Sequence, residues 1–140
     1  MRAKSNAIVV AVGLGVALLG IANAQAQTPV IQTIALKSGE TQDLGPVYYV
    51  QQHSCRSLAI AKPEAEILEG PSDVTATIKE TDVVPRAQGC ANKIRGGRLL
   101  LTAPQQIEDP SFTRLNIRIT HKTKDGDVKR SWILNLSLIP

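Results

Sequence analysis

Residues 113–138, TRLNIRITHKTKDGDVKRSWILNLSL, decide the fold. They form two runs in which apolar and polar residues alternate, with Asp125-Gly126 between them. Alternation with a period of two is typical of a strand that has one buried face, and Asp-Gly between two such runs favours a two-residue hairpin turn. The sequence therefore predicts a long C-terminal β-hairpin with Asp125-Gly126 at its turn.

The turn also predicts how the two strands pair. If Lys124 lies opposite Asp127, then Ile119 faces Trp132 and one face of the hairpin is almost wholly apolar. A slip of one residue would move polar side chains into the core, so the pattern and the turn agree on which face is buried.

Further strands are predicted where short apolar or alternating runs lie between Gly, Pro, Ser and Asp residues. These runs are residues 30–36, 46–51, 65–69, 74–79 and 98–103. The chain has 140 residues, 43% of them hydrophobic, which is enough for one domain with a core. Six or seven short strands predict an all-β fold, a small immunoglobulin-like antiparallel β-sandwich.

The first 26 residues have the pattern of a secretory signal peptide. Arg2 and Lys4 precede a 15-residue apolar run, and small residues then allow cleavage after Ala24 or Ala26. The run is shorter than the roughly 20 residues that cross a bilayer, so no membrane span is expected. We therefore expect a single sandwich domain over residues 27–140, periplasmic or secreted in a bacterium.

Cys55 and Cys90 are the two cysteines of the chain. Because an exported chain meets an oxidising compartment, we expect them to form one disulfide bond. They lack the Cys-X-X-Cys spacing of a redox pair, so a structural role is favoured over a reactive one.

Several features together resemble short exported proteobacterial proteins of uncharacterised function with an immunoglobulin-like β-sandwich. The resemblance implies a secreted β-domain and carries no activity onto particular residues. The features are Val47-Tyr48-Tyr49, Cys55, Glu69-Gly70-Pro71, Cys90, Gly96-Gly97 and the Lys122-Thr123-Lys124-Asp125-Gly126 turn region.

No catalytic residue, metal site or cofactor is predicted. His53 and His121 are the only histidines, and neighbouring residues of the extended segment His53-Ser54-Cys55 point in opposite directions. His121 is predicted on the inward side of the hairpin near its turn, without a role. Glu64 and Glu66 are interpreted as a solvated strand face. The four aromatic residues of the chain are too few to favour a sugar or nucleobase site.

Four basic residues share the predicted outer face of the hairpin. Arg114, Arg118, Lys122 and Lys129 are therefore a candidate anion-binding site, and the alternative is a solvated face that protects the sheet from edge pairing. Without the leader the chain has 14 basic and 12 acidic residues, so its net charge is small and no nucleic-acid partner is expected.

The sequence predicts a non-enzymatic binding or interaction module of the bacterial envelope, with an envelope protein or an anionic polymer as its partner. One alternative is a small secreted inhibitor of a hydrolase that acts through a loop at residues 82–89 or 103–111. Another is an enzyme whose site the sequence does not reveal.

Overall fold

The computed structural model describes residues 32–140. The predicted signal peptide and its two cleavage positions lie outside the described residues, as do the first two residues of the strand expected at 30–36. In the described part, no helix is both long and apolar enough to cross a membrane.

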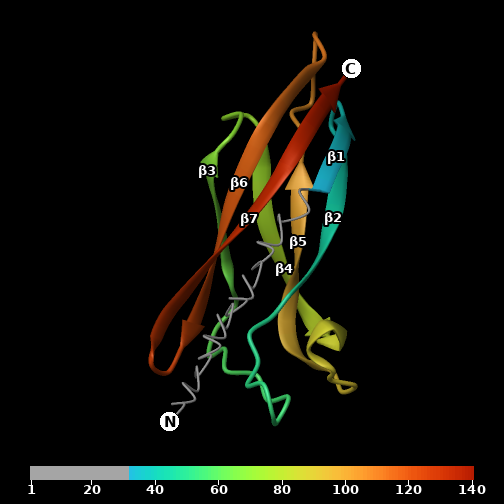
Figure 1. Cartoon of the computed structure of the whole chain (residues 1–140). Helices are drawn as coiled ribbons and strands as arrows, with labels where there is room; N and C mark the ends of the chain where they lie inside the picture. The colour runs from blue at the N-terminus through green and yellow to red at the C-terminus, as the bar shows by residue number, and fades with distance from the viewer. Residues whose placement is uncertain (1–31) are drawn as a thin grey trace, which may run out of the picture.

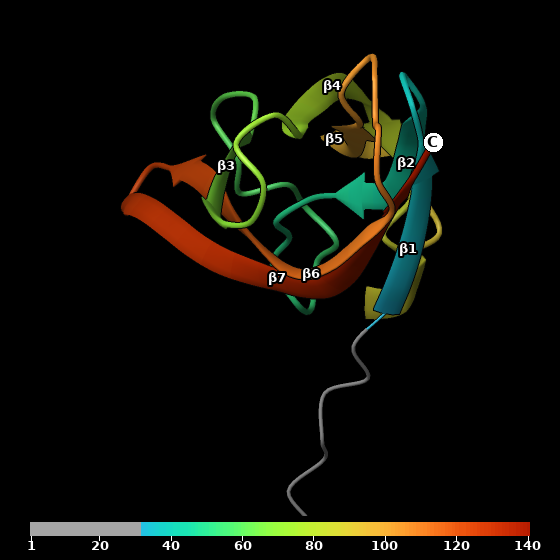
Figure 2. The ribbon, with the colours of Figure 1, turned by 90° about the horizontal axis from the view of Figure 1, so that it is seen from above.

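The described residues form seven strands and one short 3-10 helix, in two sheets that pack face to face (Figures 1 and 2). One sheet has the order β1-β7-β6-β3 and the other β2-β5-β4. The predicted all-β sandwich is therefore confirmed. The elements are β1 (Gln32–Lys37), β2 (Thr41–Val47), β3 (Glu64–Glu69), β4 (Thr75–Val83), η1 (Arg86–Gln88), β5 (Ile94–Thr102), β6 (Ser111–Thr123) and β7 (Gly126–Ile139).

The strand order is close to that of an immunoglobulin domain. If the strands are lettered A to G, the two sheets contain the groups B-E-D and G-F-C, as in a constant-type domain. The first strand differs, because β1 pairs with β7 and does so in parallel. The other pairs are antiparallel, so the expectation of a purely antiparallel sandwich is wrong at this one edge.

The C-terminal hairpin is formed by β6 and β7 with the predicted faces but a different register. Ile117, not Ile119, lies opposite Trp132, and Lys122, not Lys124, lies opposite Asp127. The pairing has moved by two residues. Because side chains alternate with a period of two, this shift leaves the same residues facing the core.

The conformation of the turn explains the shift. A two-residue type I′ turn centred on Asp125-Gly126 would need positive φ at both residues. Asp125 does not have positive φ, and the turn is instead formed by Lys124 and Asp125 between the paired residues Thr123 and Gly126. Gly126 has φ 118°, a conformation that glycine tolerates because it has no Cβ.

The core lies between the two sheets and consists almost entirely of aliphatic side chains. Alternate residues of β6 and β7 supply much of it, and burial of each such side chain stabilises the fold by roughly 1.5–3 kcal/mol. The most deeply buried members are Leu36, Leu99, Leu101, Leu115, Ile117, Ile119 and Leu136.

Strand β2 ends earlier than the predicted strand at 46–51. It spans Thr41–Val47 and contains Gly45-Pro46 within the strand. The register with β5 shifts between Asp43 and Gly45, where Gly45 has φ 125°. Because β2 is an edge strand, Pro46 is tolerated there. The tyrosines at 48 and 49 therefore leave the sheet and begin a loop.

Candidate functional site

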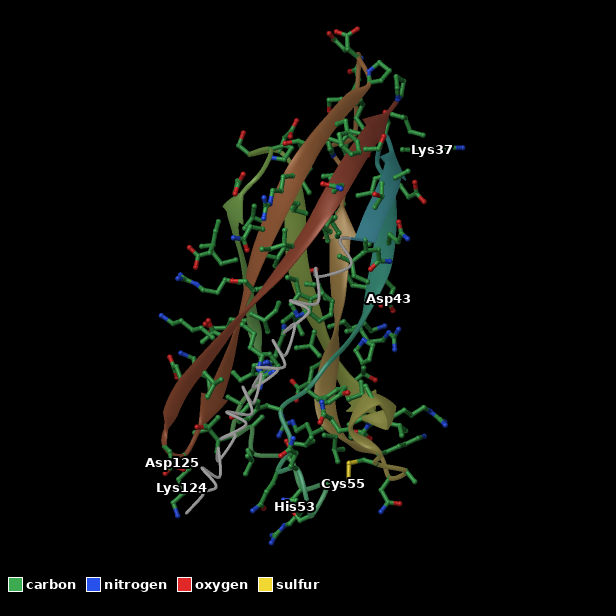
Figure 3. The ribbon with its side chains drawn as sticks, viewed as in Figure 1. Lys37, Asp43, His53, Cys55, Lys124 and Asp125 are labelled. Carbon is green, nitrogen blue, oxygen red and sulfur yellow. A yellow bond between two sulfur atoms is a disulfide. The ribbon has the colours of Figure 1, made fainter. Side chains whose placement is uncertain are left out.

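The predicted disulfide joins Cys55 and Cys90, whose Cα atoms are 5.7 Å apart. Cys55 lies in the loop between β2 and β3, and Cys90 lies just after η1. Figure 3 shows the bond at the end of the molecule that also holds the hairpin turn with Lys124 and Asp125. The bond therefore fixes two loops from different parts of the chain to one another at this end.

The loop after β2 is held by backbone hydrogen bonds as well. The Leu58 amide donates to the Tyr49 carbonyl at 2.9 Å, and the Gln51 amide donates to the Arg56 carbonyl at 3.0 Å. The Ile60 amide donates to the Lys122 carbonyl of β6 at 2.9 Å. The loop thus folds back on itself and is attached to the hairpin. These hydrogen bonds fix the backbone that carries its side chains.

Three neighbouring hollows lie between this loop, the η1 turn and the hairpin. Their volumes are about 430, 310 and 280 Å³. The 430 Å³ hollow shares Tyr49 and Leu58 with the 280 Å³ hollow, and it shares Tyr48, Gln88 and Arg130 with the 310 Å³ hollow. We call these three adjoining hollows together the aromatic groove; the residues that define it are Tyr48, Tyr49, Gln88, His121, Arg130 and Trp132.

Arg130 is the arginine that lines the 430 and 310 Å³ hollows of the aromatic groove, whereas the 280 Å³ hollow has Lys124, Asp125 and Asp127. Its guanidinium carbon lies 5.4 Å from the centre of the Tyr49 ring, a distance at which the ring attracts a cation. The Tyr49 ring is in turn 5.4 Å from the His121 ring, with an angle of 31° between their planes. Within residues 32–140, no carboxylate lies within 4.0 Å of Arg130.

His121 lies deepest in the groove and is only 3% exposed. It lines the 310 Å³ hollow, and its buried Nδ1 has no hydrogen-bond partner in the described structure. Burial lowers the pKa of His121, and the positive charge of Arg130 lowers it further. The imidazole is therefore held neutral, with a ring nitrogen that has no partner from the protein.

The predicted anion-binding residues lie on the outer face of β6 and β7, which we call the basic face. Arg118 forms an ion pair with Glu66 of β3 at 2.6 Å. Lys122 forms one with Asp127 at 3.1 Å and lies 4.0 Å from Glu64. The hydrogen bond to Asp127 is the main reason that the pKa of Lys122 is raised.

The other two predicted residues, Arg114 and Lys129, are exposed. In the observed register Lys129 lies opposite Thr120 and not opposite Lys122, so the expected pair of lysines at the turn end is not formed. The basic face therefore alternates positive and negative side chains near β3 and does not present a continuous stripe of positive charge.

The segment His53-Ser54-Cys55 does not form a nucleophilic site. The Ser54 hydroxyl donates to the Gln51 side-chain oxygen at 3.0 Å, and Cys55 is in the disulfide. His53 is exposed at the tip of the loop (Figure 3). Residues 32–140 contain no group of three or more His, Cys, Asp or Glu side chains suited to a metal ion.

The two loops proposed for an inhibitor lie at opposite ends of the sandwich (Figure 1). Residues 82–89 contain η1 and supply Gln88 to the aromatic groove. The loop at 103–111 connects β5 to β6 at the end away from the disulfide.

Sequence reasoning missed the groove because it counted aromatic residues without placing them. Tyr48 and Tyr49 follow β2, whereas Trp132 lies in β7, and only the fold brings them together. One signal was available: His121 and Arg130 are the polar exceptions in the inward-facing positions near the turn. Two such exceptions at one end of an apolar face indicate a site where the core opens to solvent.

Comparison of the chain with protein-family models, curated proteins and solved structures finds no match.

Proposed function

We propose that this protein is a non-enzymatic binding module, periplasmic or secreted in a bacterium, and that the aromatic groove is its binding site. One observation carries the proposal. Three of the four aromatic residues of the chain line one groove, together with an arginine that has no carboxylate partner in the described residues.

The chemistry of the groove supports binding over catalysis. Aromatic faces, amide groups and the Arg130 guanidinium provide contact area and directed hydrogen bonds, which orient a ligand. The nucleophile candidates near the groove are occupied, because Cys55 is oxidised and Ser54 donates to Gln51 and not to a histidine. The disulfide also supports export, since such bonds persist in oxidising compartments.

The rigid walls of the groove favour recognition of a specific partner. A ligand that binds to loops already fixed by a disulfide and by backbone hydrogen bonds does not have to order them, so less binding energy is lost. The groove walls come from the loop after β2, the η1 turn and the hairpin, and each is tied to another by one of these bonds.

The proposal is tested by capture from a bacterial envelope extract on the immobilised oxidised protein. The eluted fraction is then added to free protein, and the emission of Trp132, the only tryptophan, is recorded. A fraction that changes this emission, and that is lost with the double variant Tyr49→Ala/Arg130→Gln, supports the groove. The matched control is Arg114→Gln, which removes an exposed arginine of the basic face.

Two results would contradict the proposal. In the first, the double variant retains the same fraction as the unsubstituted protein. In the second, Arg114→Gln loses it, which would move the binding site to the basic face.

A further inference from the structure

We infer that the ligand of the aromatic groove is an acidic glycan, a linear chain of sugars that carries carboxylates. This inference rests on the proposed binding function of the groove and adds the chemical class of the ligand. It comes from three independent properties of the site, namely its shape, its polar groups and its charge.

The shape fits a linear ligand made of repeated units. The three hollows share walls in sequence, with the 430 Å³ hollow between the other two. The row runs from the hairpin turn at Lys124-Asp125, past Tyr49, to Trp132. A compact small molecule would fill one hollow, whereas an oligomer can place successive units in successive hollows.

The polar groups of the central hollow fit sugar hydroxyls. Its side chains include three amides, from Gln51, Gln52 and Gln88, beside the rings of Tyr48 and Tyr49. An amide offers a donor and an acceptor side by side, which matches neighbouring hydroxyls on a sugar ring. The aromatic faces can pack against the apolar C–H face of the same ring. The Gln51 oxygen already accepts a hydrogen bond from Ser54, so the amide nitrogen is the group of Gln51 that is left to donate.

The charge fits a carboxylate. Arg95, Arg98 and Arg118 each have a carboxylate partner within the fold. The arginines of the described residues without such a partner are Arg56, Arg86, Arg114 and Arg130, and of these only Arg130 lines the three hollows. Arg130 lies over the Tyr49 ring, and together with His121 it lines the 310 Å³ hollow, whose lining contains no carboxylate. Asp125 and Asp127 line the hollow at the hairpin turn, so the carboxylate of the ligand is placed at Arg130 and not at that end. An arginine in this position can bind a carboxylate through two parallel hydrogen bonds.

A glycan fits the groove better than an acidic peptide does. Peptide recognition relies on a few apolar or aromatic anchors that fill well-packed pockets. The central hollow is lined by two aliphatic side chains, Val50 and Leu58, and by two tyrosines, beside three amides and Arg130. The amides and the arginine supply hydrogen bonds along the hollow, and the tyrosine faces suit a sugar ring, which together favour a glycan.

The test is a titration of the oxidised full chain, followed by Trp132 emission, with two defined acidic glycans. The probes are a hexamer of galacturonate and a hexamer of mannuronate. The matched probe is the methyl-esterified galacturonate hexamer, which has the same sugar chain without the charge. Polyglutamate of similar length and charge tests the peptide alternative.

We expect at least one acidic hexamer to bind and the methyl ester to bind about tenfold more weakly, as loss of a charge-assisted hydrogen bond predicts. Arg130→Gln should weaken binding of the acidic hexamer by a similar factor. The variant protein should therefore bind the acidic and the methyl-esterified galacturonate hexamers equally. Gln88→Ala should weaken binding of both. The control Arg114→Gln should leave both affinities unchanged. Thermal unfolding of each variant verifies that it is folded.

Each contrary outcome has a distinct meaning. If neither acidic hexamer changes the emission while the envelope fraction does, the glycan inference is wrong and the proposed function stands. If polyglutamate binds as tightly as the acidic hexamers, or if Arg130→Gln still distinguishes acid from ester, the inference is also wrong. If neither the hexamers nor the envelope extract affect the groove, both proposals fail.

Discussion

On the basic face, Arg118 lies 2.6 Å from Glu66, whereas at the aromatic groove Arg130 lies over a tyrosine ring and has no carboxylate within 4.0 Å in the described residues. Both arginines belong to the same hairpin. They differ in their neighbours, because β3 places its acidic residues beside β6 at one site, whereas a loop places aromatic rings beside β7 at the other.

This difference shows that the number of cations on a surface does not measure its capacity to bind an anion. A cation that is paired with a carboxylate of the same protein must lose that partner before it can pair with an anionic ligand. The free energy of breaking the internal pair therefore offsets the free energy gained on binding. On the basic face Arg118 and Lys122 are held in such pairs within the described part of the chain, and Arg114 and Lys129 are not; in the aromatic groove Arg130 has no such pair and lies over an aromatic ring instead. Four sets of substitutions, described below, test this difference between the aromatic groove and the basic face.

The largest effect is expected from the disulfide that braces the groove. Cys90→Ser should lower the free energy of unfolding by about 2–5 kcal/mol, because the unfolded chain is no longer constrained. Chemical denaturation measures this loss, and it should also abolish the ligand-dependent change in Trp132 emission. Reduction of the unsubstituted protein should have the same effect. An unchanged denaturation midpoint would show that the loops are held without the bond.

Removal of Trp132 should have the next largest effect. Its side chain packs against the core but is only partly buried, so Trp132→Ala should cost about 2–3 kcal/mol, less than a fully buried tryptophan. The native emission maximum should lie at a shorter wavelength than that of the unfolded chain. The control Ser131→Ala, one residue away on the basic face, should change stability by less than about 0.5 kcal/mol. Equal costs for the two variants would contradict the observed faces.

The pH dependence of stability should come from the groove. The pKa of His121 is lowered in the folded protein, mainly by burial, so the unfolded chain takes up a proton first as the pH falls. The stabilisation is present above the ordinary histidine pKa of about 6.5 and is lost as the pH falls through the lower folded value. His121→Gln should remove this loss between pH 7 and 5, whereas the exposed-loop variant His53→Gln should retain it. If the loss of stability between pH 7 and 5 disappears in His53→Gln instead, the effect comes from His53 and not from His121.

The smallest effect on stability is expected at the basic face. The double variant Glu64→Gln/Glu66→Gln should change the free energy of unfolding by less than about 1 kcal/mol, because exposed ion pairs contribute little. It should nevertheless raise the salt concentration needed to elute the protein from heparin, since Arg118 and Lys122 lose partners. Glu108→Gln, in the loop at the other end, is the control. If the double variant elutes no later than the control, pairing does not limit anion binding at this face.

The faces of the hairpin could be predicted from the sequence, but its register could not. Alternation of period two is unchanged by a shift of two residues, so Ile117 and Ile119 are equivalent partners for Trp132 as far as the pattern is concerned. Only the conformation of the turn distinguishes the two registers, and that conformation depends on whether Asp125 takes a positive φ. The disulfide was predictable for a different reason, because two cysteines have a single possible pairing within one chain.

The aromatic groove could not be predicted because it depends on contacts between segments far apart in sequence. Tyr49 follows β2 and Trp132 lies in β7, so nothing local in the sequence links them. The position of His121 on the inward face was predicted, and its burial is confirmed. The contact between the His121 and Tyr49 rings was not predicted, because the segment at 46–51 was expected to continue as a strand.

The parallel pair of β1 with β7 determines when the protein can finish folding. β1 is the first strand of the domain to be synthesised, and its partner is the last, with Gln32 paired to Leu134. Such a long separation in sequence makes a contact slow to form. Until β7 has been synthesised, β1 has no partner, and the sheet that carries His121 and Arg130 stays incomplete. A chain that is exported as it emerges would therefore complete this sheet only after the whole domain has crossed the membrane.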